Sequence, residues 1–315
     1  MSRRPIFLLS LPRSGSTLVQ RVLASHPEVE TVSEPWLLLP HLYAMRDRGI
    51  ATEYTQPAAA RAIREFVGRL PGGQDDYDAA IRAFALTLYE RASAGSGSYF
   101  LDKTPRYHYV VTDLFRTFPE ARFVFLWRNP LAVVASIAET WCKGKWNVAR
   151  WQGDLQGVVS LVDAFEEHRD QVVAVRYEDL VTGGADAWAP LFSYLDLSFD
   201  PSVLVSFADV RLDGEMGDPT GQSRYRSIVA EPVDKWRRTL AAPTRKAWCR
   251  AYLDRIGEQR LTTMGYDPAE LARSLAELPT RPWTLPSDVL RGAYWAFAQR
   301  RKRLAFRWMA PRTRR

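Results

Sequence analysis

The chain has 315 residues, of which 46% are hydrophobic and 25% charged, a composition typical of globular domains rather than of disordered chains. The net charge of +7 is unevenly placed: segment 281–315 has ten Lys or Arg and one acid, Asp288, giving +9, which leaves −2 for residues 1–280. A nearly neutral body argues against a general nucleic-acid-binding surface. Cys142 and Cys249 lack metal-ligand spacing, so we expect no metal site, no disulfide framework and a cytoplasmic location.

The segment Pro5–Leu23 combines a strand pattern, a polar turn and a helix pattern. Ile6–Leu11 is a continuous apolar run of strand length, and Leu18–Leu23 repeats apolar residues with helical spacing. Between them lie Arg13, Ser14, Gly15, Ser16 and Thr17. Free N–H groups and the dipole at a helix N-terminus attract anions, so we predict that this turn binds a phosphate or sulfate group.

The turn differs from the nucleotide-binding P-loop, G-x-x-x-x-G-K-[ST], at two positions. Gly15 and Thr17 match, but Ser10 stands at the first glycine and Ser16 replaces the lysine that reaches the β and γ phosphates. Arg13 offers another cation suited to a phosphate oxyanion. An ATP-dependent P-loop kinase, which would need Mg²⁺ and that lysine, is therefore only an alternative.

Strand and helix patterns alternate along the rest of the chain. We predict strands at Tyr99–Leu101, Arg122–Trp127 and Val172–Val175, helices at Ala58–Leu70, Tyr77–Ala94, Tyr107–Phe118, Leu131–Trp141 and Thr244–Met264, and a long loop at Asp209–Asp234. This alternation predicts an α/β fold with a mostly parallel sheet, in which ligands bind at the carboxyl ends of the strands. Polar residues follow the strands at that edge: Asp102–Arg106, Arg128 and Tyr177.

Arg128 stands where a P-loop NTPase would have its acidic Mg²⁺ ligand. An arginine there repels a metal ion and attracts an anion. Together with Arg13, it predicts a nucleotide that is bound without metal and has two anionic ends. The ligand of that shape is 3′-phosphoadenosine 5′-phosphosulfate (PAPS).

Several motifs together resemble the PAPS-dependent sulfotransferase family. They are PRSGST after the first strand, HPEV, LDKTPRY, Arg128 with Ser136, RYEDLV and Lys235-Trp236. The resemblance spans Ile6–Trp236 and is closest to the branch of tyrosylprotein sulfotransferases and bacterial homologues. It implies a P-loop NTPase-like three-layer sandwich around a five-stranded, mostly parallel sheet, which we assign to a domain at 1–280.

The resemblance also implies roles in donor binding. The turn from Arg13 to Thr17 would hold the 5′-phosphosulfate, Arg128 and Ser136 would hold the 3′-phosphate, and Tyr177 would lie beside the donor. Ser227 and Lys235 correspond more loosely to late donor contacts of the family.

The expected reaction is in-line transfer of the sulfuryl group to an acceptor hydroxyl. Arg13, Lys103 and Ser16 would stabilise the charge that grows on the leaving phosphate. Two acids compete for the role of base. Glu34 matches the base of the tyrosylprotein branch and is favoured, whereas Asp102 matches a glutamate of the heparan sulfotransferases or else orients Lys103.

Segment 281–315 reads as a basic amphipathic tail, in which Tyr294, Phe297, Leu304 and Trp308 share one helical face. It predicts peripheral binding at the inner, anionic membrane face, with docking on the domain as the alternative. The expected acceptor is a hydroxyl on a saccharide, glycolipid or lipid-linked metabolite. A peptide tyrosine is the alternative, weakened because Trp36 replaces the arginine of that branch; a non-catalytic membrane-binding protein is another. The sequence indicates no oligomeric state.

Overall fold

The computed structural model describes residues 3–212, 227–228, 234–280 and 285–308. By their internal contacts the residues form two compact units. The first unit consists of Met1–Trp127 and Ser160–Ala230, and the second of Arg128–Val159 and Glu231–Arg315.

The first unit contains a five-stranded sheet with the strand order β2-β3-β1-β4-β5. Its strands are β1 (Arg4–Ser10), β2 (Val29–Thr31), β3 (Tyr99–Asp102), β4 (Arg122–Trp127) and β5 (Val173–Arg176). All neighbouring pairs are parallel. The predicted α/β class and central parallel sheet are confirmed, and β1 lies in the middle of the sheet.

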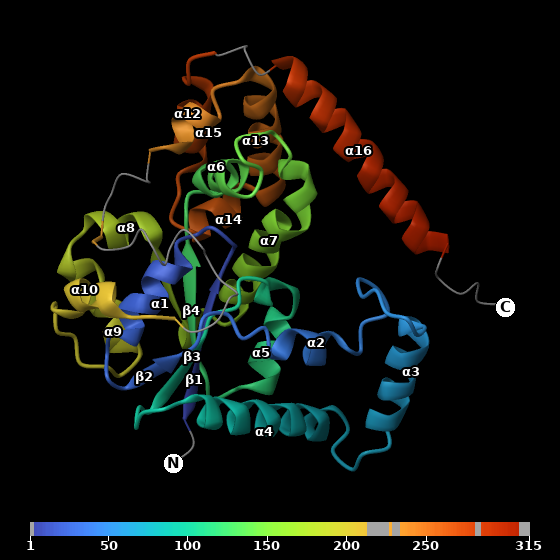
Figure 1. Ribbon diagram of the computed structural model, residues 1–315, viewed down its shortest axis with the longest axis vertical. Coiled ribbons are helices and arrows are strands. Elements are labelled where there is room, and N and C mark those ends of the chain that lie inside the picture. Colours follow the sequence, from blue (N-terminus) through green and yellow to red (C-terminus); the bar gives the residue numbers. More distant parts are fainter. Residues whose placement is uncertain (1–2, 213–226, 229–233, 281–284, 309–315) are drawn as a thin grey trace. The chain divides into compact units, whose positions relative to one another are not determined.

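Helices cover both faces of this sheet (Figure 1). The described helices of the first unit are α1 (Ser16–Ala24), α2 (Leu38–Tyr43), α3 (Gln56–Val67), α4 (Gln74–Ala92), η1 (Tyr107–Tyr109), α5 (Val111–Thr117), η3 (Arg169–Gln171), α8 (Tyr177–Thr182), η4 (Ala185–Ala187), α9 (Ala189–Tyr194), α10 (Val203–Ser206) and η5 (Phe207–Asp209). Helix α7 (Gln152–Glu167) belongs to both units.

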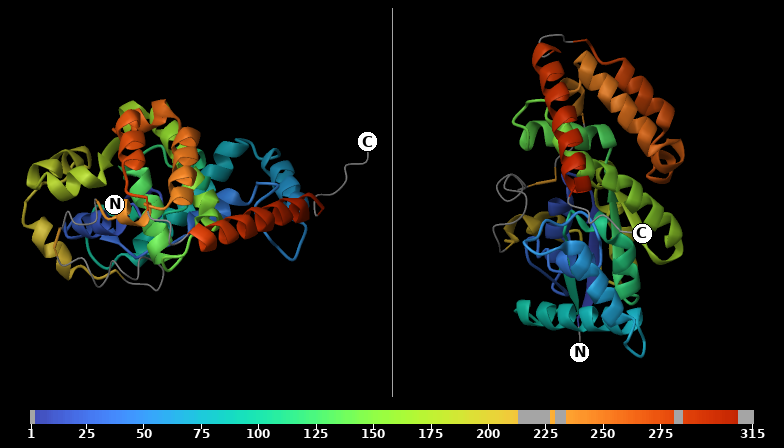
Figure 2. Two further views of the ribbon diagram at one scale, coloured as in Figure 1. Left: turned by 90° about the horizontal axis from the view of Figure 1, so that it is seen from above. Right: turned by 90° about the vertical axis from the view of Figure 1, so that its right-hand side faces the viewer.

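Alternate residues of the central strands form two apolar faces. On one face Phe7 packs on Phe118, with ring centroids 5.1 Å apart, and Phe123 stacks on Phe115 of α5 at 3.9 Å. Helix α1 packs on β1 and β2. Helix α4 runs near the amino end of β1, where Arg3 is 2.8 Å from Glu90 (Figure 2). The central strands β1 and β4 are apolar over most of their length because both faces of the sheet are covered.

Most of the predicted elements occur within a few residues of their expected bounds. The three-residue strand β2 and the helices α2 and α7 were not predicted, and the predicted helix Tyr107–Phe118 is divided into η1 and α5. The predicted helix Thr244–Met264 is two helices, because the chain turns at Gly257, where φ is +86°. Most of the predicted loop Asp209–Asp234 lies outside the described residues.

The second unit is helical. Its elements are α6 (Pro130–Thr140), η2 (Val148–Trp151), α12 (Trp236–Thr239), α13 (Pro243–Ile256), α14 (Glu258–Thr263), α15 (Pro268–Ala276) and α16 (Leu285–Trp308). Helix α16 contains most of the predicted tail. None of the described helices combines the length and apolar character required to cross a membrane.

The first turns of α16 pack on other parts of the second unit. Asp288, buried, forms an ion pair with Arg245 of α13 (Nε–Oδ2 2.8 Å), and Trp295 Nε1 donates to Asn147 Oδ1 at 3.0 Å. Leu290, Tyr294 and Phe297 are 72%, 63% and 62% exposed. Since a helix turns about 100° per residue, these three apolar side chains project away from Asp288.

Candidate active site

The predicted anion-binding turn lies between β1 and α1, at the carboxyl edge of the sheet. Helix α1 begins at Ser16, and its N-cap Gly15 has φ +90°. Arg13 also has a positive φ, +68°, which is uncommon outside glycine and often found at functional sites. The backbone N–H groups of the first helical turn therefore face the turn, as an anion requires.

Tyr177 supports the turn from the side. It is 1% exposed at the start of α8, directly after β5. A Cβ atom on Gly15 would lie 2.3 Å from Tyr177 Cδ2, far inside van der Waals contact. Thus the structure brings together two residues that the sequence placed near the donor, and it shows why position 15 has no side chain.

Glu34 and Lys103 form a largely buried ion pair. Lys103 follows β3 and Glu34 follows the neighbouring strand β2, and Lys103 Nζ donates to Glu34 Oε1 at 2.6 Å. The Lys103 side chain is 2% exposed and the Glu34 side chain 10%. Because water screens such a pair weakly, each charge depends on the other for compensation.

Trp36 holds the second oxygen of Glu34. Its indole Nε1 donates to Glu34 Oε2 at 3.1 Å, and its backbone N donates to Thr104 Oγ1 at 3.2 Å. Trp36 has φ +53°, a strained conformation for a bulky residue. The Arg106 guanidinium lies 5.1 Å from the centre of the Trp36 ring. These contacts link the segments after β2 and β3.

Asp102 lies at the centre of a buried hydroxyl cluster. It is 0% exposed, and its oxygens accept hydrogen bonds from Tyr89 Oη (2.6 Å), Tyr107 Oη (2.7 Å) and Thr104 Oγ1 (3.0 Å). Burial raises the pKa of Asp102 from 3.8 to about 6, and the three hydroxyl donors oppose this shift. Thr104 thus connects Asp102 to the backbone of Trp36.

This shifted pKa predicts a pH-dependent contribution to stability. A carboxyl whose folded pKa is raised stabilises the fold fully below its unfolded pKa of 3.8, and this stability is lost as the pH rises through about 6. The shift corresponds to roughly 3 kcal/mol. Relative to Asp102→Asn, the wild-type free energy of unfolding should therefore decline between pH 4 and 7. Denaturant titrations measure it, with exposed Asp170→Asn as control; parallel curves for wild type and Asp102→Asn would contradict the expectation.

The second unit holds three other predicted donor contacts. Arg128 is buried directly after β4, Ser136 is half-buried in α6, and Lys235 is exposed at the N-cap of α12. Helix α12 packs against α6, and Thr239 donates to Glu139. The unit therefore brings the Lys235 helix to the Ser136 helix. Ser227 is an exposed bend residue of the first unit.

The predicted anion-binding turn and the carboxylate–lysine pair both follow parallel strands, the arrangement expected of a group-transfer site in a P-loop-like fold. The comparisons with known proteins name it: the model of the sulfotransferase family matches residues 5–201, and the chain belongs to this family. The predicted family and class of enzyme are confirmed.

Two relatives and two solved structures illustrate the similarity. Nodulation protein NoeE of Sinorhizobium fredii is 39% identical over 140 residues, 43% of this chain and 31% of that protein. Protein-tyrosine sulfotransferase 1 of Danio rerio is 26% identical over 285 residues, 84% of this chain and 72% of that protein. The sulfotransferase domain of the Synechococcus PCC 7002 olefin synthase matches with TM-score 0.54 and 25% identity, covering 75% of this chain and 88% of that one. The sulfotransferase domain of the curacin biosynthetic pathway matches in fold, with TM-score 0.56, 21% identity and coverage of 84% and 99%. The alignment with NoeE thus spans less than a third of that protein's length.

Proposed function

We propose that the chain transfers the sulfuryl group of PAPS to an acceptor hydroxyl, with Glu34 as the general base. The observation that carries this proposal is the Lys103–Glu34 pair, with 2.6 Å between Nζ and Oε1. The pair follows the adjacent strands β3 and β2, and β3 is also the neighbour of β1, the strand that leads into the predicted anion-binding turn. A base and a cation side by side suit a reaction that removes a proton from one oxygen and adds charge to another.

The choice between the two candidate bases rests on access. Both oxygens of Asp102 accept hydrogen bonds, and the residue is fully buried, so an acceptor hydroxyl has no path to it. Glu34 is slightly exposed and accepts a hydrogen bond from Lys103 at one oxygen and from Trp36 at the other, and a carboxylate has about four acceptor sites in all. We therefore assign Asp102 to positioning Lys103 and Thr104.

PAPS would supply an activated sulfuryl group. The residues of the chain would bind PAPS and accept the proton of the acceptor hydroxyl. The N–H groups of the turn, with Arg13, Ser14, Ser16 and Thr17, suit the 5′-phosphosulfate. The acceptor oxygen forms its bond to sulfur as the sulfur–oxygen bond to the phosphate breaks, and the acceptor proton moves to Glu34. Lys103 and Arg13 stabilise the phosphate charge left on the departing nucleotide.

For the 3′-phosphate end of the donor we propose Arg128 and Ser136, with Lys235 and Ser227 as further contacts and Tyr177 as the support of the turn. These assignments come from the motifs. The burial of Arg128 is compatible with them, because an arginine in low dielectric binds a phosphate more strongly than an exposed one.

The acceptor and the location of the protein are proposed from the relatives and from the surface of α16. The two named relatives differ, since one is a nodulation protein and the other a protein-tyrosine sulfotransferase. We retain a hydroxyl on a saccharide, glycolipid or lipid-linked metabolite, with a protein tyrosine as the alternative. The two free cysteines support a cytoplasmic location. The exposed Leu290, Tyr294 and Phe297, beside a basic sequence, support contact with an anionic membrane, which co-sedimentation with phosphatidylglycerol vesicles measures.

Calorimetric titration with 3′-phosphoadenosine 5′-phosphate (PAP), the desulfated product, in EDTA tests the donor assignment. We expect binding without metal, weakened about ten- to a hundredfold in Arg128→Ala, the value of a lost hydrogen bond to a charged group. Arg122→Ala, at the amino end of the same strand, is the matched control. Failure of the wild type to bind PAP, combined with ATP binding that Mg²⁺ strengthens, would favour the kinase alternative.

A further inference from the structure

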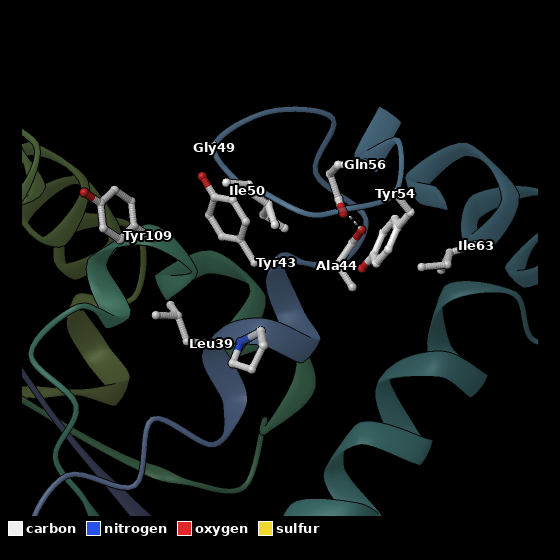
Figure 3. Close-up of a pocket in the computed structure, with 11 residues that line it drawn as sticks. Leu39, Tyr43, Ala44, Gly49, Ile50, Tyr54, Gln56, Ile63 and Tyr109 are labelled. Carbon is white, nitrogen blue, oxygen red and sulfur yellow. Dashed lines mark hydrogen bonds between the residues drawn. The ribbon is translucent and has the colours of Figure 1, made fainter. Parts of the chain in front are cut away.

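The first unit contains a cavity of about 650 Å³ that no predicted role uses (Figure 3). It lies between α2, the loop that follows α2, helix α3 and η1. Its wall is apolar and aromatic, with Leu39, Tyr43, Ile50, Tyr54, Ile63 and Tyr109 as main contributors. The volume is typical of sites for small organic ligands.

The cavity is built before any ligand arrives. Gln56 is buried, and its Nε2 donates to the carbonyl oxygens of Ala44 (2.9 Å) and Arg46 (3.1 Å). These bonds tie the loop after α2 to the start of α3. At Gly49, where φ is +90°, a Cβ atom would lie 2.6 Å from Tyr43 Oη, so the backbone holds the tyrosine closely. The wall is therefore preorganised for its occupant.

The chemistry of the wall selects an apolar occupant. No lining residue has a carboxylate, ammonium or guanidinium group, and the Gln56 amide N–H₂ already has two acceptors. The polar side-chain groups that remain in the wall are three tyrosine hydroxyls and the Gln56 carbonyl oxygen. They are too few to pair all the hydroxyls of a saccharide, and each unpaired hydroxyl costs free energy. An alkyl chain or an aromatic ring loses none and gains buried area.

Two chain segments lead from the Glu34–Lys103 pair to this cavity. Helix α2 begins four residues after Glu34, and η1 begins four residues after Lys103. The segments are in contact near the pair, where Arg106 lies over the Trp36 ring at 5.1 Å, and again at the cavity, where the Tyr43 and Tyr109 rings meet edge-on at 6.3 Å. Helix α2, with six residues, is about 9 Å long.

We propose that this cavity binds the apolar part of the acceptor, an alkyl chain or an aromatic ring, while the hydroxyl of the acceptor lies at Glu34. The inference rests on the proposed sulfuryl transfer and narrows its acceptors to alcohols or phenols with an apolar body on the order of 10 Å long, the length of α2. Among the acceptors named above, it favours the lipid-linked class over a free saccharide.

The test is binding of straight-chain alcohols from 1-butanol to 1-decanol, and separately of 2-naphthol, to the chain saturated with PAP and to the chain alone. Each methylene added should tighten binding about fourfold until the cavity is filled. The substitution Ala51→Trp places a large side chain in the cavity from an exposed loop position. In this variant the affinity for alcohols should no longer increase with chain length. Ala83→Trp, exposed on α4, is the control and should behave as the wild type.

The outcomes separate this proposal from the proposed function. Two results would overturn the cavity assignment even if PAP binds. The first is an alcohol affinity that does not depend on chain length, together with no binding of 2-naphthol. The second is a chain-length dependence that stays unchanged in both Ala51→Trp and the milder Ile63→Ser. If alcohol affinity depends on chain length but the protein does not bind PAP, the result supports the cavity assignment and contradicts the assignment of PAPS as donor. Binding of 2-naphthol without a chain-length effect assigns the cavity to an aromatic acceptor, and the reverse assigns it to an alkyl one.

Discussion

Replacing Glu34 by glutamine should lower kcat by about 10²–10⁴-fold, the usual contribution of a general base. The amide keeps the shape of the side chain but cannot take the acceptor proton. Its single oxygen can replace only one of the two carboxylate oxygens that accept hydrogen bonds from Lys103 and Trp36, and its N–H₂ group faces the other donor. Binding of PAP should persist, because Glu34 is not among the proposed donor contacts. Transfer of labelled sulfate and calorimetry with PAP measure the two quantities.

Two further variants make this test specific. Glu34→Asp keeps the negative charge that Lys103, 2% exposed, needs as compensation, but shortens the reach, so it should fold like the wild type and retain partial activity. Glu65→Gln, exposed on α3, should change nothing. Near-normal turnover in Glu34→Gln would move the role of base to Asp102, despite its burial.

The substitution Gly15→Ala should abolish measurable PAP binding. Loss of one hydrogen bond to a charged group weakens binding about ten- to a hundredfold, and Gly15→Ala should disturb several such contacts, so we expect a loss of more than about a hundredfold. Its Cβ would lie 2.3 and 2.4 Å from two atoms of the Tyr177 ring, and the backbone at φ +90° resists any side chain. The turn or the ring must move, and the N–H groups that face the anion move with the turn.

A second glycine with positive φ serves as a control that distinguishes the effect of backbone strain from the effect of the clash with Tyr177. Gly184 has φ +63°, and a Cβ atom added there would have no neighbouring atom within 4 Å, so Gly184→Ala should cost stability and leave PAP binding intact. A double-mutant cycle with Tyr177→Ala should be strongly non-additive, because removing the ring removes the obstacle. Additive losses would show that the ring does not determine the conformation of the turn.

The sequence was sufficient for the elements that have strong local patterns. Continuous apolar runs predicted β1 and β4, and the structure has both strands within a residue or two of the predicted bounds. Strand β2 was missed because three residues show no periodicity. The helix break at Gly257 was missed because a single glycine within a helical pattern does not reveal its φ value.

The partners of the candidate site were harder to predict than its members. Glu34, Lys103 and Asp102 were named from motifs, but their contacts depend on residues brought together by the tertiary fold. Tyr89, on α4, carries no local signal that its hydroxyl binds Asp102. Trp36 was interpreted only as a missing arginine, whereas its ring donates to Glu34. The apolar cavity likewise depends on how the loop after α2 folds back, which no pattern specifies.

The position of β1 in the sheet has a consequence for the order of folding. Ile6 pairs on one side with Leu101 and on the other with Arg122, and none of the five described strands forms a hairpin with the next one in the sequence. The anion-binding turn therefore cannot gain its final support until the ribosome has released the chain through β4, and Tyr177 arrives later still. Sheets with such distant pairings fold slowly and expose apolar strands meanwhile. During synthesis, β1 is therefore the strand of this sheet whose apolar side chains remain longest without their partner strands.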